Sequence, residues 1–416
     1  MTGRIGRESA NLIFLQGMNY LLNFLIVPYT VRVLGVQSFG LISYAAAFNS
    51  FFILIIEYAF NISAVQKLSG SKLNRTDSEE IIISIINAKL FLLLISGIVY
   101  LVLILSIDQL RKNYLLFLLS FIPSISSLFS VPWNYIINRQ TGYLLKINII
   151  GKILILAGIF LFVKYENDLY LFLLITGGGA FIINIILFMK MKLQQRLKIR
   201  YAGIKKILET LTGGGSLFLS SLASGTYTSI PLMIFGLNNN FTGSADFAAA
   251  DKIRSVIQSF IHSLTQAVSP DISAIIKESF DEAKRLIYKS LITGAILSFV
   301  AGIILLAGGK IIVILLFGPG LESALPALYI LSFVPFFSFM SNLAGFYTMP
   351  LLNLSGKLLI ITASASLLNL LVSLIIIPGG SAVHAAVILF ITEFMAAVSM
   401  LYFVPIAFKK MPEINK

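Results

Sequence analysis

Long apolar segments recur along this chain, and they restrict the environments in which it can fold. A typical one, "AKLFLLLISGIVYLVLILS" at 88–106, contains a single charged residue. A helix needs about 20 mostly apolar residues to cross the hydrocarbon of a bilayer, because that layer is about 30 Å thick. Only 12% of all residues are charged, whereas soluble domains carry about 25%. The sequence therefore predicts an all-α, polytopic membrane protein.

Twelve segments are long and apolar enough to be transmembrane helices: 9–34, 38–65, 81–107, 114–137, 144–164, 168–189, 211–237, 245–269, 286–308, 324–347, 356–377 and 382–408. The apolar segment 310–320 is too short to span a bilayer, so it either extends the ninth helix or lies at the interface. The first segment is longer than a signal-peptide core and has no clear cleavage site. We expect it to be a retained transmembrane helix.

Basic residues follow the predicted topology. With a cytoplasmic N-terminus, most Lys and Arg residues fall in cytoplasmic segments, and the outer side holds only Arg111, Lys112, Lys164 and Lys310, with Arg32 near a helix end. Short cytoplasmic loops of membrane proteins are enriched in Lys and Arg. The pattern predicts that both termini are cytoplasmic. It also accounts for the net charge of +13 without a nucleic-acid partner.

The longest polar connection, "KMKLQQRLKIRYAGIKKILE" at 190–209, divides the chain near its middle. We expect an N-terminal six-helix bundle at 1–189, a basic cytoplasmic linker at 190–210 and a C-terminal six-helix bundle at 211–416. An amphipathic helix along the anionic inner leaflet is the favoured structure for the linker. A solvated linker is the alternative.

The two halves share a sequence pattern at an offset of 203 residues. Six predicted crossings separate the equivalent points, so both halves run through the membrane in the same direction. This arrangement indicates parallel, pseudo-symmetric repeats around a central cavity, as in transporters that work by alternating access. The matching features are Pro28 and Pro231, Gly40 and Gly243, and the aromatic–Ala–Ala–Ala runs at 44–47 and 247–250.

Ionisable residues inside apolar segments are the best pointers to a site, because burial in a bilayer is costly and they usually face a bundle interior or a cavity. In the eighth segment, Arg254, Gln258 and His262 follow one another at four-residue spacing and form one polar stripe. Asp251 lies one turn before Arg254 and can pair with it, whereas Lys252 lies on a different face. Snorkelling of Asp251 and Lys252 to the outer surface is the alternative.

In the second segment, Glu57 is predicted near mid-span, on the same face as Asn61. A buried glutamate could bind a proton or a cation, and an ion pair with Lys89 of the third segment is an equally good interpretation. Lys89 and Lys152 are expected within about two turns of the cytoplasmic side, and Glu393 in the twelfth segment has no obvious partner. Glu57, Asp251 and Glu393 are the candidates for ion coupling or salt bridges.

The first segment carries a further polar stripe: Gln16, Asn19, Tyr20 and Asn23. We include these four residues in the predicted substrate cavity, together with Arg32, Asn61, Lys89, Lys152, Lys252, Arg254, Gln258 and His262. The chain has no Cys, and its two histidines, His262 and His384, fit no metal-ligand spacing. We therefore expect neither a metal nor an organic cofactor, and only H+ or Na+ as a coupling ion.

Several stretches, taken in order, resemble the O-antigen (Wzx-type) flippases, which belong to the polysaccharide transporter branch of the multidrug/oligosaccharidyl-lipid/polysaccharide (MOP) exporter superfamily. They are "PYTVRVLGVQSFGL" at 28–41, "EYAFNISA" at 57–64 and "FAAADKIRSVIQSFIHSLTQAVSPDIS" at 247–273. The stretch "PWNYIINRQTGY" at 132–143 departs from the pattern of many relatives, because Asn138, Arg139 and Gln140 replace its polar core.

The resemblance implies a flippase that moves an undecaprenyl-pyrophosphate-linked oligosaccharide from the cytoplasmic to the periplasmic leaflet of the bacterial inner membrane. Membrane lipids, an O-antigen polymerase and a chain-length regulator would be its other partners. Arg254 with Lys89 or Lys152 would meet the pyrophosphate. The sugar hydroxyls would meet Gln16, Asn19, Asn23, Asn61 and Gln258.

Three rival functions remain open from the sequence. A multidrug or other lipid-linked-substrate exporter of the same superfamily is the nearest. A membrane polysaccharide polymerase or ligase is disfavoured, because no outer loop is large enough for a catalytic site. A receptor or scaffold is disfavoured by the doubled bundle and the buried charges.

Overall fold

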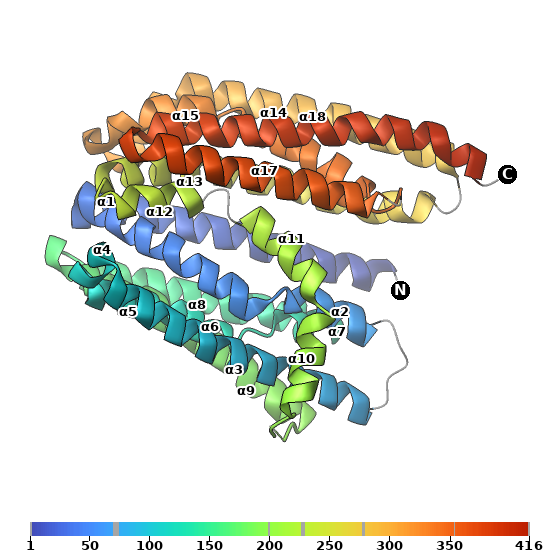
Figure 1. Cartoon of the computed structure of the whole chain (residues 1–416), viewed down its shortest axis with the longest axis horizontal. Coiled ribbons are helices and arrows are strands. Elements are labelled where there is room, and N and C mark those ends of the chain that lie inside the picture. The colour runs from blue at the N-terminus through green and yellow to red at the C-terminus, as the bar shows by residue number, and fades with distance from the viewer. Residues whose placement is uncertain are drawn as a thin grey trace. The chain divides into compact units, whose positions relative to one another are not determined.

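The computed structural model describes residues 2–69, 75–198, 200–225, 229–276, 279–352 and 354–414, and all of its regular elements are helical. The chain forms two compact units (Figure 1). Unit 1 contains Met1–Ile26, Val33–Ser38 and Tyr44–Gly225, and unit 2 contains Val27–Arg32, Phe39–Ser43 and Thr226–Lys416. The all-α membrane fold predicted from the sequence is confirmed, and the domain boundaries at 189 and 211 stay a prediction.

Unit 1 consists of α1 (Thr2–Glu57, except for two short stretches that belong to unit 2), α2 (Phe60–Ser69), α3 (Arg75–Ser106), α4 (Asp108–Lys112), α5 (Tyr114–Ser120), α6 (Ile122–Ser127), α7 (Pro132–Ile137), α8 (Thr141–Phe162), η1 (Glu166–Asp168), α9 (Leu169–Gln195), α10 (Ile204–Thr212) and α11 (Gly215–Gly225). Its core lies where α2, α3, α7 and α9 meet, around Phe60, Trp133 and Leu187.

Besides its two stretches of α1, unit 2 contains α12 (Ser229–Leu237), α13 (Phe241–Ile275), α14 (Phe280–Phe317), η2 (Pro319–Ala324), α15 (Leu325–Leu331), α16 (Val334–Met340), the π-helix η3 (Ser341–Thr348), α17 (Ser355–Ile376), η4 (Ile377–Gly379) and α18 (Ala382–Ile414). α13 packs against α14, α15, α16 and α18. One buried cluster of this unit surrounds Ile287, Leu343 and Met400.

Nine helices in the described part of the chain are long and apolar enough to cross a membrane. The predicted segments 9–34 and 38–65 lie largely in the single helix α1, which breaks at Gly35 (φ 82°, ψ 163°). The segment 211–237 is divided between α11 and α12, and 245–269 lies in α13. α14 continues to Phe317, so the short segment 310–320 mostly extends the ninth predicted helix. The total of twelve spans stays a prediction.

The connection at 190–209 is not one surface helix. α9 continues to Gln195 and ends at Arg196, whose φ of 53° is left-handed, and α10 begins only at Ile204. α10 packs on α3, where Lys206 pairs with Glu80 and the Asn87 side chain donates a 3.0 Å hydrogen bond to the carbonyl of Arg200. Only the second part of the predicted helix is therefore present as a separate helix.

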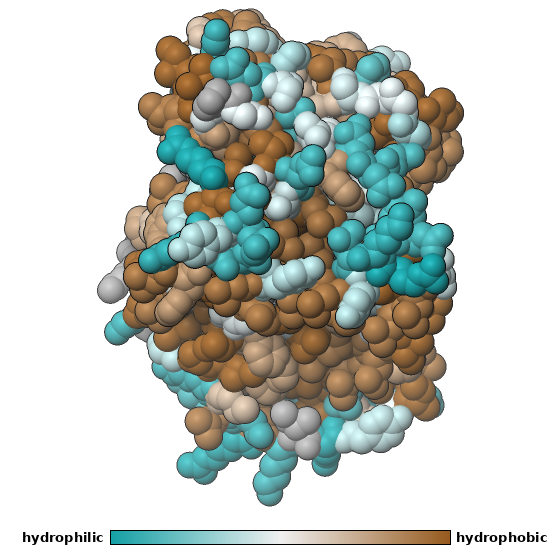
Figure 2. Space-filling model, turned by 90° about the vertical axis from the view of Figure 1, so that its left-hand side faces the viewer, coloured by the Kyte–Doolittle hydropathy of each residue, from teal (hydrophilic) through white to brown (hydrophobic). Residues whose placement is uncertain are grey.

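Much of the surface is apolar, as a chain in lipid requires. Figure 2 shows hydrophobic residues in brown over much of the visible face, with hydrophilic ones between them. On α3, large apolar side chains such as Leu94, Ile98 and Leu105 are at least 60% exposed. Exposed apolar groups on this scale would aggregate in water, so these helix faces are suited to hydrocarbon.

The two copies of the repeated pattern touch one another within unit 2. The Ser244 hydroxyl donates a 3.0 Å hydrogen bond to the carbonyl of Gly40. A Cβ added at Gly40 would overlap the backbone carbonyl of Phe241. Gly40 is thus required by close backbone approach, because a main-chain atom cannot swing aside as a side chain can.

We expect Gly40→Ala to destabilise the protein by about 1–3 kcal/mol, the usual cost of overpacking. The measurement is the apparent melting temperature of the purified chain in detergent. Gly356→Ala is the matched control, since a Cβ there has no neighbour within 4 Å. Equal melting temperatures for the two variants would contradict the contact.

Candidate functional site

A buried lysine is the centre of the polar network in unit 1. Lys89 is 1% exposed and lies about two turns into the apolar part of α3. Its ammonium donates hydrogen bonds to the carbonyls of Ser127 (3.1 Å) and Ser130 (2.9 Å). Both carbonyls lie where the chain leaves α6 before α7 begins. A buried ammonium needs such acceptors, because an unpaired charge in a low dielectric is very costly.

Glu57 completes this network from the end of α1. Its carboxylate lies 3.8 Å from the Lys89 ammonium and accepts a 2.5 Å hydrogen bond from the Asn61 side-chain amide. Tyr58 and Ala59, with φ of 45° and 54°, separate α1 from α2 and bring Asn61 back over Glu57. Residues other than Gly rarely adopt this left-handed backbone conformation, which commonly marks a functional or constrained site.

The structure corrects one expectation about Glu57. It is the last residue of α1 and not a mid-helix residue, because the left-handed pair ends the helix there. Its side chain is 20% exposed, whereas that of Lys89 is 2% exposed. The ion pair with Lys89, one of the two interpretations of Glu57, is present. The Asn61 side-chain oxygen is buried and has no hydrogen-bond partner among the described residues.

The polar stripe of the eighth predicted helix forms the network of unit 2. Arg254 is 5% exposed. It contacts the Asp251 carboxylate at 2.7 Å and donates to the Gln258 side-chain oxygen. Gln258 in turn donates a 2.7 Å hydrogen bond to the hydroxyl of Ser338 on α16. The predicted pairing of Asp251 with Arg254 is therefore present, because residues three and four positions apart share one helix face.

Glu393 on α18 belongs to the same region of unit 2. It lies close enough to Arg254 for the guanidinium charge to act on its carboxylate. The chain continues from Ser338 into the π-helix η3, a wider form that is frequent at functional sites. Arg254 thus pairs with Asp251 of its own helix, interacts electrostatically with Glu393 of α18, and links α13 to α16 through Gln258.

The other candidate residues are more scattered. Lys252 is exposed, on a different face of α13 from Arg254. Lys152 is half-buried in the middle part of α8. Arg32 is exposed and donates a 2.5 Å hydrogen bond to the carbonyl of Leu315. The side chains of Gln16, Asn19, Tyr20, Asn23 and His262 lie outside the described part of the structure, so their place in a cavity stays a prediction.

Sequence reasoning missed several polar contacts. Ser338 was not singled out, and neither was Asn49, which accepts a buried 2.6 Å hydrogen bond from Ser124. The Asn369 side-chain amide of α17 donates a 3.0 Å hydrogen bond to the hydroxyl of Thr392 on α18. These are isolated polar residues in apolar runs, without the periodic stripe that marks Arg254. Among the described residues no group of three or more His, Asp and Glu side chains could hold a metal ion.

Solved structures share this fold over nearly the whole chain. The lipid II flippase MurJ in an inward closed conformation matches with a TM-score of 0.72 and 16% identity, over 97% of this chain and 89% of that protein. An inward-facing multidrug resistance transporter of the MATE family, also of the MOP superfamily, matches with a TM-score of 0.66 and 14% identity over 96% of both chains. The fold is that of a multi-pass membrane transporter.

The family follows from the sequence comparison. Residues 5–277 match the family described as "Polysaccharide biosynthesis protein", and the chain belongs to that family. The "Putative O-antigen transporter" of Escherichia coli (strain K12) is 28% identical over 95% of this chain and 96% of its own length. A protein of the same description from Shigella dysenteriae is 26% identical over 67% of this chain and 70% of its own. These findings confirm the resemblance seen in the sequence and identify a transporter, not an enzyme.

We expect Lys89 and Glu57 to stabilise the fold jointly, so that substitutions at the two positions have coupled effects on the free energy of unfolding. Lys89→Met should lower the melting temperature, because the Ser127 and Ser130 carbonyls and the Glu57 carboxylate lose their donor. Removing one partner of a buried pair costs up to about 3–5 kcal/mol, and the partial exposure of Glu57 reduces that figure.

A double-mutant cycle with Glu57→Gln isolates the pairwise energy. Glu57→Gln should destabilise the wild type more than it destabilises the Lys89→Met variant. Arg111→Met with Asp108→Asn is the control pair, since both of its side chains are more than 60% exposed and exposed pairs contribute little. Additive effects at Lys89 and Glu57 would show that the pair contributes no coupling.

Proposed function

We propose that this chain is a flippase that moves undecaprenyl-pyrophosphate-linked O-antigen repeat units across the bacterial inner membrane. Transport would run from the cytoplasmic to the periplasmic leaflet by alternating access, with both termini cytoplasmic. The main support is the similarity to an O-antigen transporter over 95% of the chain. The buried Arg254 network gives that proposal a physical basis.

The substrate sets the chemical problem. A pyrophosphate and a chain of sugars lose their hydration in hydrocarbon, and each buried polar group without a partner costs several kcal/mol. A path through the protein must replace water with cations and hydrogen-bonding groups, while the lipid tail stays in the bilayer. Arg254, Lys89 and Lys152 would serve the pyrophosphate. Asn61, Gln258 and the stripe Gln16, Asn19, Tyr20 and Asn23 would serve the sugars.

Among the described residues, the two buried cations are held by internal partners. Arg254 is engaged by Asp251 and Gln258, and Lys89 by two carbonyls and Glu57. An incoming pyrophosphate would therefore compete with carboxylates for the same cations. Each buried cation would then have two alternative partners, an internal group or the pyrophosphate of the substrate. Two such states are what a transporter needs, because binding of the substrate can then favour one conformation over the other.

Coupling to an ion is the second part of the proposal. Glu57 and Glu393 are carboxylates near a buried cation, so a proton or Na+ that neutralised either one would weaken its hold on Lys89 or Arg254. An O-antigen polymerase and a chain-length regulator would receive the product on the outer side. No tightly bound cofactor is needed for this cycle.

Loss of Arg254 should abolish most transport. In a strain that lacks its own O-antigen flippase, we expect Arg254→Ala to lower surface O-antigen at least about tenfold, in line with the loss of a charge-assisted contact. Lys252→Ala is the matched control, because it removes an exposed cation two positions away. If cells with Arg254→Ala carried as much surface O-antigen as cells with the wild-type protein, at equal protein levels, the proposed role of Arg254 in transport would be refuted.

Energy coupling has its own measurement. In inverted vesicles that carry labelled lipid-linked substrate, we expect collapse of both the proton and the Na+ gradients to slow transport severalfold. Collapse of each gradient alone identifies the ion. Glu57→Gln or Glu393→Gln should make transport insensitive to that ion. An undiminished rate after both gradients are removed would exclude ion coupling without affecting the proposed substrate.

A further inference from the structure

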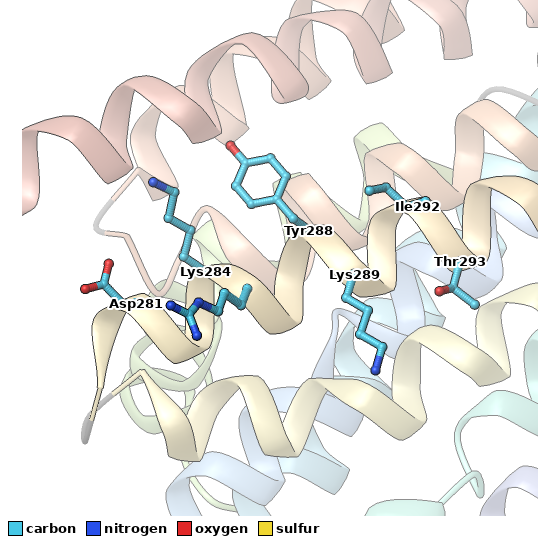
Figure 3. Close-up of a pocket in the computed structure, with 7 residues that line it drawn as sticks. Asp281, Lys284, Tyr288, Lys289, Ile292 and Thr293 are labelled. Atoms are coloured by element: carbon cyan, nitrogen blue, oxygen red, sulfur yellow. The ribbon is translucent and has the colours of Figure 1, made fainter.

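A basic recess lies at the start of α14, and none of its lining residues belongs to either buried network. It has a volume of about 690 Å³. Two adjacent helical rows line it: Asp281, Arg285 and Lys289 in one, and Lys284, Tyr288 and Ile292 in the other. Figure 3 shows these side chains along the first turns of the helix. All of them belong to unit 2.

The recess carries an excess of positive charge. Lys284, Arg285 and Lys289 are exposed, and none of them forms a salt bridge within the described residues. Asp281 is the one acidic residue of the lining. Three neighbouring cations repel one another, so an anion bound among them would relieve that repulsion. A phosphate group suits such a cluster, since Arg and Lys supply several donors in a small volume.

An apolar strip continues from the recess along the same side of α14. From Lys289 the three- and four-residue steps of a helix face lead to large apolar side chains between 45% and 61% exposed: Ile292, Ile296, Val300 and Ile303. A soluble anion would leave this strip unused. A molecule with an anionic head and hydrocarbon chains would cover the recess and the strip together.

The Tyr288 side chain of the lining suits a position at the boundary between water and membrane. Tyr288 lines it and packs near Phe408 of α18, with ring centroids 6.3 Å apart, and Phe280 packs on the same ring at 5.1 Å. Trp and Tyr are enriched at membrane–water interfaces. The basic residues here belong to the expected cytoplasmic side, where anionic lipids create a negative surface potential.

We propose that this recess binds the phosphate headgroup of an anionic phospholipid, with its acyl chains along the apolar strip of α14. Arg285 and Lys289, which share one helical row, contact the phosphate; Lys284 adds positive charge beside them, and Tyr288 contacts the glycerol region. The site goes beyond the proposed transport function, because its occupant is a resident lipid of the membrane and not the transported molecule. A test of this lipid site is therefore independent of a test of the proposed transport function.

Lipid binding by the full chain in detergent tests the proposal. Phosphatidylglycerol and phosphatidylcholine are titrated separately, and bound lipid is counted by native mass spectrometry. A basic residue near an anionic surface contributes about 1 kcal/mol, which corresponds to about fivefold in affinity. We expect the triple variant K284Q/R285Q/K289Q to bind phosphatidylglycerol at least about tenfold more weakly than the wild type, with phosphatidylcholine unchanged.

The control variant K112Q/K164Q/K310Q removes the same charge from exposed lysines at other positions and should bind phosphatidylglycerol like the wild type. If the triple variant does not fold, R285Q alone should show about a fivefold loss. Equal phosphatidylglycerol binding by the triple variant and the wild type would overturn the proposal. Displacement of phosphatidylglycerol by millimolar inorganic pyrophosphate would overturn it too, because it would assign the recess to a soluble anion.

Discussion

An ionised side chain within an apolar helix must find its counter-charge inside the protein, and the polar architecture of this chain depends on that requirement. Lys89 and Arg254 are 1% and 5% exposed, yet each is surrounded by acceptors. In a low dielectric such contacts are strong, and the same low dielectric makes an unpaired charge very costly. Each cation is therefore stable only while its partners stay in place, unless an anion from outside takes over.

Three irregular parts of the backbone lie beside these charges or beside a residue that contacts them. The left-handed pair Tyr58 and Ala59 follows Glu57, and the break between α6 and α7 supplies the carbonyls that hold Lys89. The π-helix η3 follows Ser338. Backbone that departs from the α-helix is tolerated at membrane depth only where protein or a polar cavity satisfies it. The first two of these departures lie beside the groups that hold Lys89.

The exposed residues differ from the buried polar networks in both composition and position. The exposed faces of α3 and α14 are apolar, while exposed Lys and Arg residues gather toward helix ends. At the start of α14 both features meet on one helix. The buried cations Lys89 and Arg254 are held by partners within their unit. The exposed cations at the start of α14 form no salt bridge within the described residues and can bind mobile anions. In our proposals the same residue types serve transport in one place and attachment to lipid in another.

Much of this organisation was predictable because it is local. The length of the apolar segments determines an all-α membrane fold, since every backbone group must be paired within its own helix. The spacing of Asp251, Arg254 and Gln258 places them on one helix face, and the structure shows them in contact. The resemblance to polysaccharide transporters could be read from short stretches in order.

Only the tertiary structure decided which distant groups complete each network. Nothing near Arg254 in the sequence points to Ser338 or Glu393, and nothing near Lys89 points to the carbonyls of Ser127 and Ser130. The end of α1 at Glu57 was also missed, because Tyr58 and Ala59 have no intrinsic preference for a left-handed backbone. Such features arise from packing between segments far apart in the chain, whereas hydrophobic length and helical spacing act within a single segment and are written in its sequence.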